Sequence, residues 1–324
     1  MEQLKSNWKS SIKSGEYKRK DSQFRHWITE DGSAGPTGNA GFKAEAGRYH
    51  LFVSLACPWA HRTLIFRQLK NLNDLISVSV VHPDMHGQGW SFKHDDESAR
   101  LYETTGDSLG ESQFLAEKYF QNQRDYQGNI TVPVLWDKQN EQIVNNESAD
   151  IIRMLNQAFD SLTGNTLDLY PTQLQPQIDE INELVYHKIN NGVYKSGFAT
   201  SQQAYDKNVT ALFDALETVE HILSSQRYLV GATLTEADWR LWTTLVRFDS
   251  VYHTHFKCNL KLIKEFPNLY QYMLELYQIE GVPETLNMAH IKRHYYASHL
   301  AINPYGVVPM GHEQNWSLAH NRGE

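Results

Sequence analysis

The pattern of apolar positions changes from strand to helix periodicity between residues 49 and 72. Residues 49–55 form a short apolar run rich in β-branched and aromatic side chains, which is typical of a buried strand. After Pro58, apolar residues recur at helical spacing, at Ile65, Leu69 and Leu72. Cys57 therefore lies where a strand leads into a helix.

More strands and helices are predicted before residue 160. An alternating β-branched run over residues 76–81 predicts a second strand. Two strands joined through a helix form a βαβ unit, so we expect parallel pairing and a right-handed crossover. Residues 82–109 are polar and are predicted to form a long loop. The pattern then predicts a helix over 111–120, strands over 130–136 and 142–144, and a helix over 145–155.

Beyond residue 159 the apolar residues follow helical spacing almost throughout. The predicted helices cover residues 178–189, 204–223, 236–252 and 269–277. Thr235-Glu-Ala-Asp238 has the spacing of a capping box at the start of the third of these. We therefore predict an extended arm over residues 1–46, an α/β domain over 47–160, and an all-helical domain with an irregular C-terminal tail over 161–324.

Composition and charge narrow the possible partners. The 324 residues are 40% hydrophobic, which is enough to fill the cores of two domains. A formal net charge of -8 argues against nucleic acid or an anionic membrane as the main partner. No apolar run approaches the roughly 18 residues that span a bilayer, and the N-terminus lacks an apolar signal core. With only two cysteines, we expect a protein of the reducing cytoplasm, where glutathione is the abundant thiol.

Cys57 has the position of a nucleophile. Proline is favoured at the first helical position, so Pro58 places Cys57 at the helix N-cap. The helix N–H groups and dipole favour the thiolate form there. In a dithiol redox protein the second cysteine of Cys-x-x-Cys would stand where this chain has Ala60. Any oxidised intermediate would therefore be a mixed disulfide that an outside thiol resolves. The alternative is a buried structural cysteine.

Two backbone features could hold a peptide ligand beside Cys57. X-Pro bonds are the usual place for a cis peptide, and a cis Val132-Pro133 bond would turn the polar backbone groups of Val132 toward an extended peptide. The alternative is an edge proline with no ligand. Ser148 lies near the start of a predicted helix, where the free N–H groups suit a carboxylate. It could also cap that helix.

Aromatic residues suggest a site for a ring. Trp90 and Phe92 in the long polar loop could form a substrate wall or anchor the loop. Tyr194 lies between two glycines, and residues 294–299 are rich in tyrosine and histidine. Tyrosine hydroxyls and rings suit a phenol or a quinone, although tyrosines also pack between helices. The loop histidines His82, His86 and His94 match no compact metal-binding spacing, so we expect no metal.

Taken together, these motifs and their order resemble a cytosolic glutathione transferase. More narrowly, they are similar to the glutathionyl-hydroquinone reductases, or Xi class. The motifs that carry this resemblance are Asp21-Ser-Gln-Phe-Arg-His-Trp27, Cys57-Pro-Trp-Ala60, Trp90-Ser-Phe92, Gly192-Val-Tyr-Lys-Ser-Gly-Phe198, His294-Tyr-Tyr296 and Asn303-Pro304. The Cys-Pro-x-Ala motif alone would also suit the omega class. The resemblance implies a thioredoxin-like α/β N-terminal domain, an all-α C-terminal domain and a homodimer.

The resemblance also implies how a glutathione co-substrate is held. Cys57 would be the nucleophile, and the backbone of Val132 would hold the cysteinyl part of glutathione. Glu147 and Ser148 would bind the γ-glutamyl end. The remaining contacts of the tripeptide would come from Trp90 and Arg124.

The implied reaction is glutathione-dependent reduction of S-glutathionyl-hydroquinones to hydroquinones. Tyr194 and Tyr295 would line the aromatic site, although Tyr296 could take the place of Tyr295. Two alternatives remain open at this point. One is an omega-like thiol transferase or dehydroascorbate reductase that uses the same cysteine. The other is a non-catalytic glutathione-binding scaffold that senses redox state.

Overall fold

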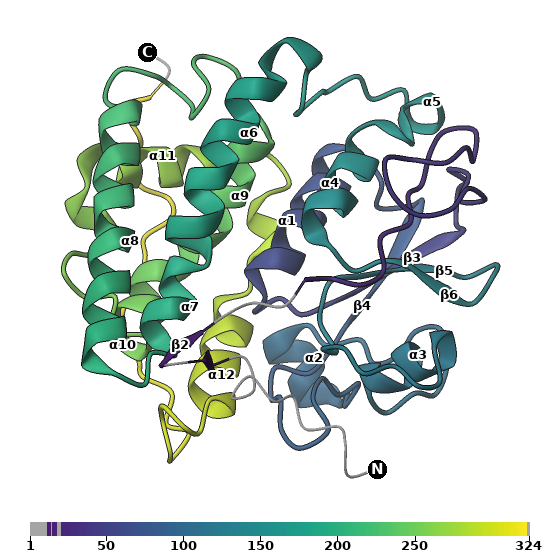
Figure 1. Ribbon diagram of the computed structural model, residues 1–324, viewed down its shortest axis with the longest axis horizontal. Helices are drawn as coiled ribbons and strands as arrows, with labels where there is room; N and C mark the ends of the chain where they lie inside the picture. The colour runs from purple at the N-terminus through teal and green to yellow at the C-terminus, as the bar shows by residue number, and fades with distance from the viewer. Residues whose placement is uncertain (1–11, 14, 18–20, 323–324) are drawn as a thin grey trace. The chain divides into compact units, whose positions relative to one another are not determined.

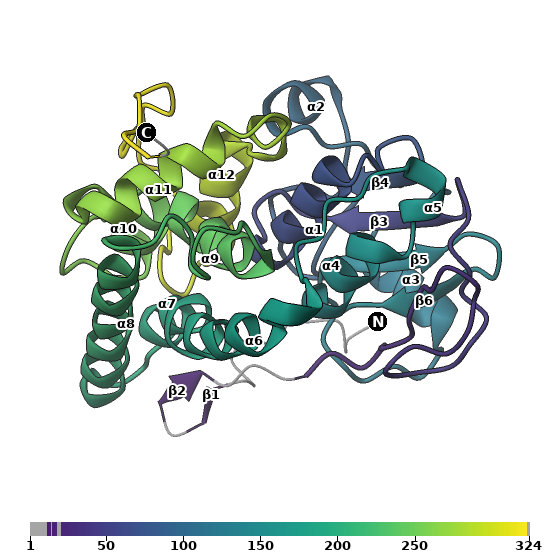
Figure 2. The same cartoon turned by 90° about the horizontal axis from the view of Figure 1, so that it is seen from above.

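The computed structural model describes residues 12–13, 15–17 and 21–322, and their contacts separate into two units. The first, called here the thioredoxin-like unit, contains residues 21–168 and 284–307. The second, called the helical unit, contains residues 169–283 and 308–322, together with the described residues of the arm before position 18. This is the thioredoxin-like plus all-α architecture that the resemblance implies. Figures 1 and 2 show the elements of each unit.

A four-stranded mixed sheet forms the centre of the thioredoxin-like unit. The strands are β3 (Tyr49–Val53), β4 (Ile76–Val80), β5 (Val134–Asp137) and β6 (Gln142–Asn145), in the order β4-β3-β5-β6. β3 pairs in parallel with β4, which confirms the predicted βαβ unit, and antiparallel with β5. Every residue of β3 is buried, as expected for a strand with neighbours on both edges and helices on both faces.

Helices cover both faces of this sheet. Figure 1 shows α1 (Pro58–Leu69) and α4 (Ser148–Gln157) together on one face and α3 (Leu115–Asn122) on the other. The polar segment 82–109, predicted as a loop, contains the helix α2 (Asp96–Tyr102). This helix is short and mostly polar, so it lacks an apolar period. Its start is fixed instead by a capping box in which Asp95 accepts from the Ser98 N–H.

The helix α12 (Met288–Ser298) belongs to the thioredoxin-like unit, although its residues fall within the predicted domain 161–324. It follows a 3₁₀ turn at Pro283–Thr285. The His290 Nε2 lies 3.2 Å from the Ser54 Oγ, and the His61 Nε2 lies 2.8 Å from the Thr285 Oγ1. Polar contacts between residues more than two hundred positions apart leave no local pattern in the sequence. The domain limits drawn from the pattern stay a prediction.

The helical unit consists of helices joined by short turns. They are α6 (Gln175–Leu184), α7 (Gly192–Gly197), α8 (Gln202–Leu223), α9 (Glu236–Arg247), α10 (His253–His255) and α11 (Pro267–Tyr277), while the short α5 (Asp160–Thr163) precedes the unit. π-helical turns at Val185–Asn190 and Phe248–Tyr252 continue α6 and α9, so two of the predicted helices each contain an α-helix and a π turn. A small hairpin in the arm pairs β1 (Ile12–Lys13) with β2 (Glu16–Tyr17). Among the described helices, none has both the length and the apolar character that a membrane span requires.

A buried aspartate organises the start of α9. The Asp238 carboxylate accepts from the backbone N–H of Leu229 at 2.9 Å and of Thr235 at 2.8 Å. It also accepts from the hydroxyls of Thr235 and Tyr272, at 3.1 and 2.9 Å. Burial raises the pKa of Asp238 to about 6, while these hydrogen bonds act to lower it. The predicted capping box is therefore confirmed, and it also connects α9 to α11.

Candidate functional site

Cys57 occupies the N-cap of α1, as the sequence predicts. Its φ and ψ of -77° and 118° are extended, and Pro58 is the first helical residue. The Cys57 C=O accepts from the His61 N–H at 2.9 Å, which is the first hydrogen bond of the helix. The side chain is partly exposed, and neither cysteine of the chain is in a disulfide. The sulfur therefore combines the start of a helix with an accessible surface, as an attacking thiol requires.

Val132 lies directly beside the sulfur. The Cys57 Sγ lies 3.4 Å from the Val132 backbone oxygen and donates to it. The Val132-Pro133 peptide bond is cis, as predicted, and β5 begins at the next residue. A cysteine thiol and a backbone acceptor are thus within contact distance at one end of the sheet.

Glu147, rather than Ser148, caps α4. The Glu147 Oε1 accepts from the Ala149 N–H at 3.1 Å, and the Ser148 hydroxyl lies 3.5 Å from the same oxygen. Ser148 is the first residue of the helix and is buried. A carboxylate at this position interacts favourably with the positive end of the helix dipole. The two residues predicted to bind the γ-glutamyl end therefore lie together at one helix start.

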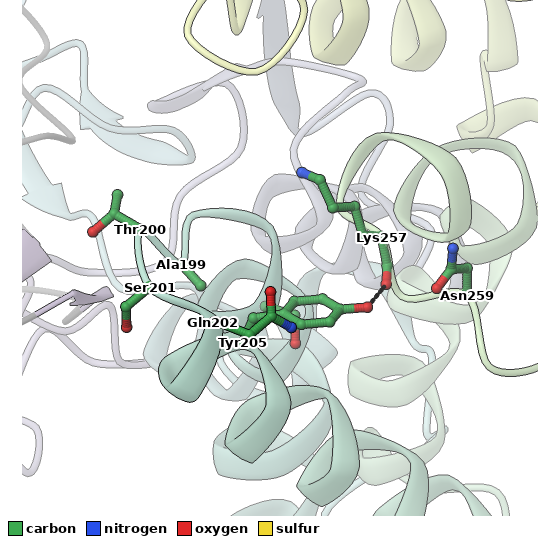
Figure 3. A pocket seen from close by; sticks show the side chains of 8 residues that line it. Ala199, Thr200, Ser201, Gln202, Tyr205, Lys257 and Asn259 are labelled. Atoms are coloured by element: carbon green, nitrogen blue, oxygen red, sulfur yellow. Dashed lines mark hydrogen bonds between the residues drawn. The ribbon is translucent and has the colours of Figure 1, made fainter.

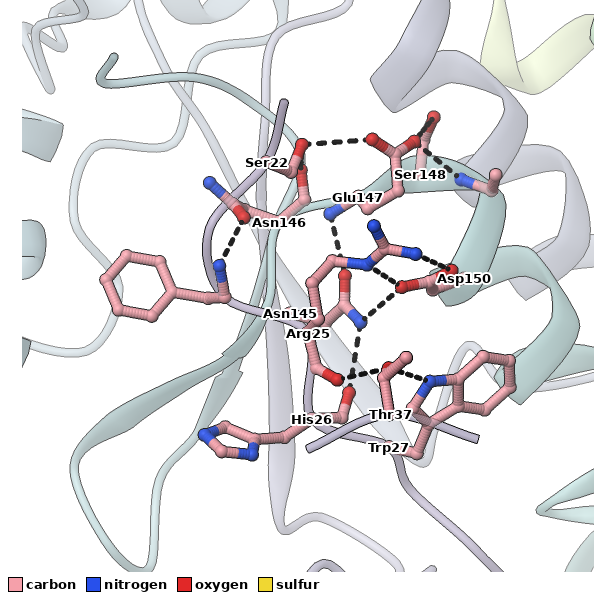
Figure 4. A network of polar contacts seen from close by, with 12 residues as sticks. Ser22, Arg25, His26, Trp27, Thr37, Asn145, Asn146, Glu147, Ser148 and Asp150 are labelled. Atoms are coloured by element: carbon pink, nitrogen blue, oxygen red, sulfur yellow. Dashed lines mark hydrogen bonds and ion pairs between the residues drawn. The ribbon is translucent and has the colours of Figure 1, made fainter. Parts of the chain in front are cut away.

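The arm contributes two residues here that the sequence motifs do not assign to the site. The Ser22 hydroxyl donates to the Glu147 Oε2 at 3.0 Å, and Arg25 forms a two-point ion pair with Asp150 (Figure 4). The hydrogen bond to Asp150 raises the pKa of Arg25, to which the nearby charge of Glu147 adds. The similarity of residues 21–27 to the Xi class was the one signal that could have found them.

Trp90 and α12 form a second part of the thioredoxin-like unit. The buried Trp90 ring stacks on His294, with ring centroids 4.8 Å apart and planes at 23°. The His294 Nδ1 lies 2.8 Å from the Pro83 oxygen, and Arg293 pairs with Asp84 at 2.6 Å. These contacts hold the segment after β4 against α12.

Of the other sequence-predicted residues in this unit, the tyrosines are buried and the arginine is exposed. Tyr295 and Tyr296 follow His294 on α12, and both are buried. Arg124 lies in the turn after α3. Within the described part of the chain, no hydrogen bond or ion pair joins Arg124 to the other candidate residues. The structure therefore groups Cys57 with Val132 and Glu147 with Ser148, and leaves Arg124 apart from both pairs.

Tyr194 lies in the helical unit, on α7, within a group of aromatic rings. Its ring centroid is 5.6 Å from that of Phe256, 6.1 Å from those of Phe198 and Tyr252, and 6.4 Å from that of Tyr17 on the arm. The side chain is half-buried. The glycines on either side of Tyr194 are the first and last residues of α7.

The helical unit also has a pocket of about 420 Å³ (Figure 3). Its lining is mostly polar and includes Tyr205, whose hydroxyl donates to the Lys257 oxygen at 2.6 Å. Next to Lys257, Cys258 is fully buried, and burial raises the pKa of its thiol. Among the described residues, no three His, Cys, Asp or Glu side chains are arranged to hold a metal ion.

Comparisons with known proteins agree with this geometry. The family model described as the glutathione S-transferase N-terminal domain matches residues 56–158, and that of the C-terminal domain matches residues 202–275. The chain is 53% identical to glutathionyl-hydroquinone reductase YqjG of Escherichia coli K12 over 308 residues, which cover 95% of this chain and 92% of the relative. It is 46% identical to glutathionyl-hydroquinone reductase PcpF of Sphingobium chlorophenolicum, over 93% of this chain and 91% of the relative.

Solved structures of glutathione transferases also match this chain over most of its length. The glutathione-bound structure of YqjG superposes with a TM-score of 0.90, over 93% of this chain and 96% of that one. The Xi glutathione S-transferase of Phanerochaete chrysosporium, 47% identical, superposes with a TM-score of 0.87 over 95% of this chain and 97% of that one. The chain therefore belongs to the glutathione S-transferase family, and within it to the Xi class.

Proposed function

We propose that this protein reduces S-glutathionyl-hydroquinones to free hydroquinones, with glutathione as the reductant. The observation that carries the proposal is the partly exposed Cys57 thiol at the start of α1, with Ala60 where a resolving cysteine would stand. A thiol at a helix start is a nucleophile, and the missing partner leaves the second step to an outside thiol. The relatives named glutathionyl-hydroquinone reductases, at 46% and 53% identity, support this reaction above a general thiol transfer.

The first step breaks a carbon–sulfur bond. The Cys57 thiolate attacks the sulfur of the bound S-glutathionyl-hydroquinone, and a disulfide forms between Cys57 and glutathione. The electron pair of the broken bond stays on the ring carbon, which takes up a proton and leaves as free hydroquinone. The two sulfurs together lose two electrons as the disulfide forms, and these two electrons reduce the ring carbon.

The second step restores the thiolate. A glutathione thiolate attacks the sulfur of the glutathionyl group, releasing glutathione disulfide and the Cys57 thiolate. The two steps together convert one S-glutathionyl-hydroquinone and one glutathione into one hydroquinone and one glutathione disulfide. A second cysteine at position 60 would compete with glutathione for this step, so Ala60 suits the scheme.

The glutathionyl part of the substrate is assigned to the thioredoxin-like unit. The backbone of Val132, beside the Cys57 sulfur, would pair with the cysteinyl residue. The ammonium and carboxylate groups of the γ-glutamyl end would meet the Glu147 carboxylate and the Ser148 hydroxyl at the start of α4. Trp90 and Arg124 are proposed for the rest of the tripeptide. The partly exposed sulfur would then face the substrate sulfur.

The hydroquinone ring is assigned to tyrosines. Tyr194 and Tyr295 would hydrogen-bond the ring oxygens, which stabilises the departing hydroquinone. Replacing Tyr194 with phenylalanine keeps the ring packing and removes the hydroxyl. We expect the Tyr194→Phe variant to lose about tenfold or more in kcat for a glutathionyl-hydroquinone, but less than twofold for a small glutathione mixed disulfide.

The comparison needs both substrates assayed on the same preparation. Tyr305→Phe is the matched control, because Tyr305 is 92% exposed in the C-terminal tail. Equal losses on the two substrates would contradict a role for the Tyr194 hydroxyl at the ring.

Mass spectrometry of the protein tests the reaction itself. Incubation with one equivalent of an S-glutathionyl-hydroquinone, without free glutathione, should add one glutathionyl group to Cys57 and release hydroquinone. Added glutathione should then remove the adduct. An adduct that retains the ring, or one on Cys258, would contradict the mechanism. An omega-like thiol transferase or dehydroascorbate reductase would form the adduct only from disulfides, and a non-catalytic scaffold would bind glutathione without releasing hydroquinone.

We also propose that the reaction takes place in the cytoplasm. A reducing cytoplasm would supply glutathione and keep both cysteines as thiols, the form in which the structure has them. A homodimer is proposed from membership of the family.

A further inference from the structure

The arm runs beside the last strand of the sheet and the start of α4. The His26 N–H donates to the Val144 oxygen at 2.9 Å, and the Asn146 N–H donates to the Phe24 oxygen at 3.1 Å. Arg25 thereby pairs antiparallel with Asn145, as an additional strand would. The Asn146 side chain accepts from the Phe24 N–H at 3.1 Å. The arm is therefore fixed by its backbone next to the segment that leads into Glu147.

The arm is also fixed by side chains further along. Phe24 packs on Tyr119 and Tyr126, with ring centroids 5.9 and 5.3 Å apart. Ile28 is buried, and its N–H lies 3.0 Å from the Met154 sulfur on α4. Arg25 forms its two-point ion pair with Asp150 in the first turn of α4. These contacts leave Ser22 little freedom relative to Glu147.

The Ser22 hydroxyl donates to the Glu147 carboxylate, and it also lies 3.2 Å from the Asn146 backbone oxygen. One carboxylate oxygen accepts from the Ala149 N–H of α4 at 3.1 Å. The other accepts from the Ser22 hydroxyl at 3.0 Å (Figure 4). A glutamate side chain has several rotatable bonds, and holding both oxygens selects one orientation before a ligand arrives. The Ala149 N–H and the Ser22 hydroxyl are both uncharged donors, and the negative charge of the Glu147 carboxylate suits an ammonium group.

The negative charges around this point explain why the arm carries an arginine. Asp21, Glu147 and Asp150 all act on Arg25. Asp150 is buried and bound by Arg25, and it also accepts from the Asn145 side chain at 3.1 Å. Asp150 thus forms an ion pair with a cation of the arm. Glu147 is the carboxylate of this cluster that the arm orients through a neutral hydroxyl.

We propose that Ser22 is a positioning residue for glutathione: its hydroxyl orients the Glu147 carboxylate toward the ammonium group of the γ-glutamyl end. The inference rests on the proposed function, because it assumes that the γ-glutamyl end binds at Glu147 and Ser148. It adds the arm to the site, as the segment that orients the carboxylate through which glutathione is distinguished from thiols without a γ-glutamyl group. Removal of the hydroxyl would weaken binding of the whole tripeptide and leave the chemistry at Cys57 unchanged.

Calorimetric titration with S-methylglutathione, which cannot react, tests the inference. We expect Ser22→Ala to raise the Kd for S-methylglutathione about fivefold, since a charge-assisted hydrogen bond that orients the receptor is lost. Ser22→Thr keeps the hydroxyl and should restore the wild-type Kd. Ser33→Ala is the matched control, because Ser33 is an exposed serine of the same arm whose hydrogen bonds to described residues all stay within the arm. An unchanged Kd in Ser22→Ala, or no binding to the wild type, would overturn the inference.

Kinetics with two thiols distinguishes a positioning role of Ser22 from a role in supporting the fold. In the resolving step, Ser22→Ala should raise the KM for glutathione about fivefold with kcat within twofold, and should leave the rate with cysteinylglycine unchanged. Equal losses with both thiols would mean that Ser22 only supports the fold, and would overturn the inference. Turnover of glutathionyl-hydroquinone by the wild type is a separate result. If turnover fails while the shift in Kd is seen, the proposed reaction is wrong and the role of Ser22 stands.

Discussion

Replacement of Cys57 by serine is expected to abolish turnover of S-glutathionyl-hydroquinones, with a loss in kcat/KM on the order of a thousandfold or more. A serine hydroxyl stays protonated under conditions in which a thiol at a helix start ionises. The proposed mechanism includes no general base that would remove the proton from the serine hydroxyl. The fold should be kept, because Cys57 makes no side-chain cap contact to α1. Steady-state kinetics with a glutathionyl-hydroquinone measures the loss, and circular dichroism checks the fold.

Cys258 provides the matched control for this substitution. It is the other cysteine of the chain and is fully buried in the helical unit. Cys258→Ser should keep kcat/KM within about threefold, although burial of a hydroxyl will lower stability. A Cys57→Ser variant that retains a tenth of the wild-type activity, or a Cys258→Ser variant that folds and is inactive, would show that the reaction does not run through Cys57.

Replacement of Asp238 by alanine should have the largest effect on stability. The carboxylate accepts four hydrogen bonds from Leu229, Thr235 and Tyr272. Without it, two backbone N–H groups and a tyrosine hydroxyl are buried without their partner, and each such loss costs about 1–3 kcal/mol. We expect the free energy of unfolding to fall by about 3 kcal/mol or more, as measured by urea denaturation. Asp214→Ala on α8, where the side chain is exposed, should change it by less than about 0.5 kcal/mol.

The loss of unfolding free energy in the Asp238→Ala variant should also depend on pH. The pKa of Asp238 is raised from 3.8 to about 6 in the folded protein. A raised pKa means that the folded state binds the proton more tightly, so this contribution to stability is full below pH 3.8 and disappears as the pH rises through 6. The difference in unfolding free energy between wild type and Asp238→Ala should therefore be larger at pH 4 than at pH 7. A difference that grows between pH 4 and pH 7 would contradict the raised pKa.

The strand and helix around Cys57 were predictable because their signals are local. The apolar run of β3, the Cys57-Pro58 pair and the spacing of α1 each occupy a few adjacent residues. The Thr235 to Asp238 capping box is equally local. Secondary structure of this kind follows from residues close together along the chain, so the sequence alone predicts the βαβ unit and the helices of the helical unit.

Other features of the fold and the site could not be predicted, either because their local pattern is weak or because their partners are far away in the sequence. α2 is short and polar, so its apolar periodicity is too weak to predict a helix. The predicted γ-glutamyl residues Glu147 and Ser148 are adjacent in sequence, whereas Ser22 reaches Glu147 from 125 positions away. Likewise, the stacking of Trp90 on His294 joins two segments that the pattern placed in different domains. The sequence indicates which residues are candidates for binding or reaction, but it does not indicate which distant residues contact them.

The division of the thioredoxin-like unit into residues 21–168 and 284–307 has a consequence for synthesis of the protein. A ribosome delivers the whole sheet and α1 long before it delivers α12, which brings His290 to Ser54. In the nascent chain, the segment before Cys57 therefore lacks the contact between Ser54 and His290 until synthesis is almost complete. A gene fragment that stops at residue 168 would encode Cys57 without the helix that completes its unit.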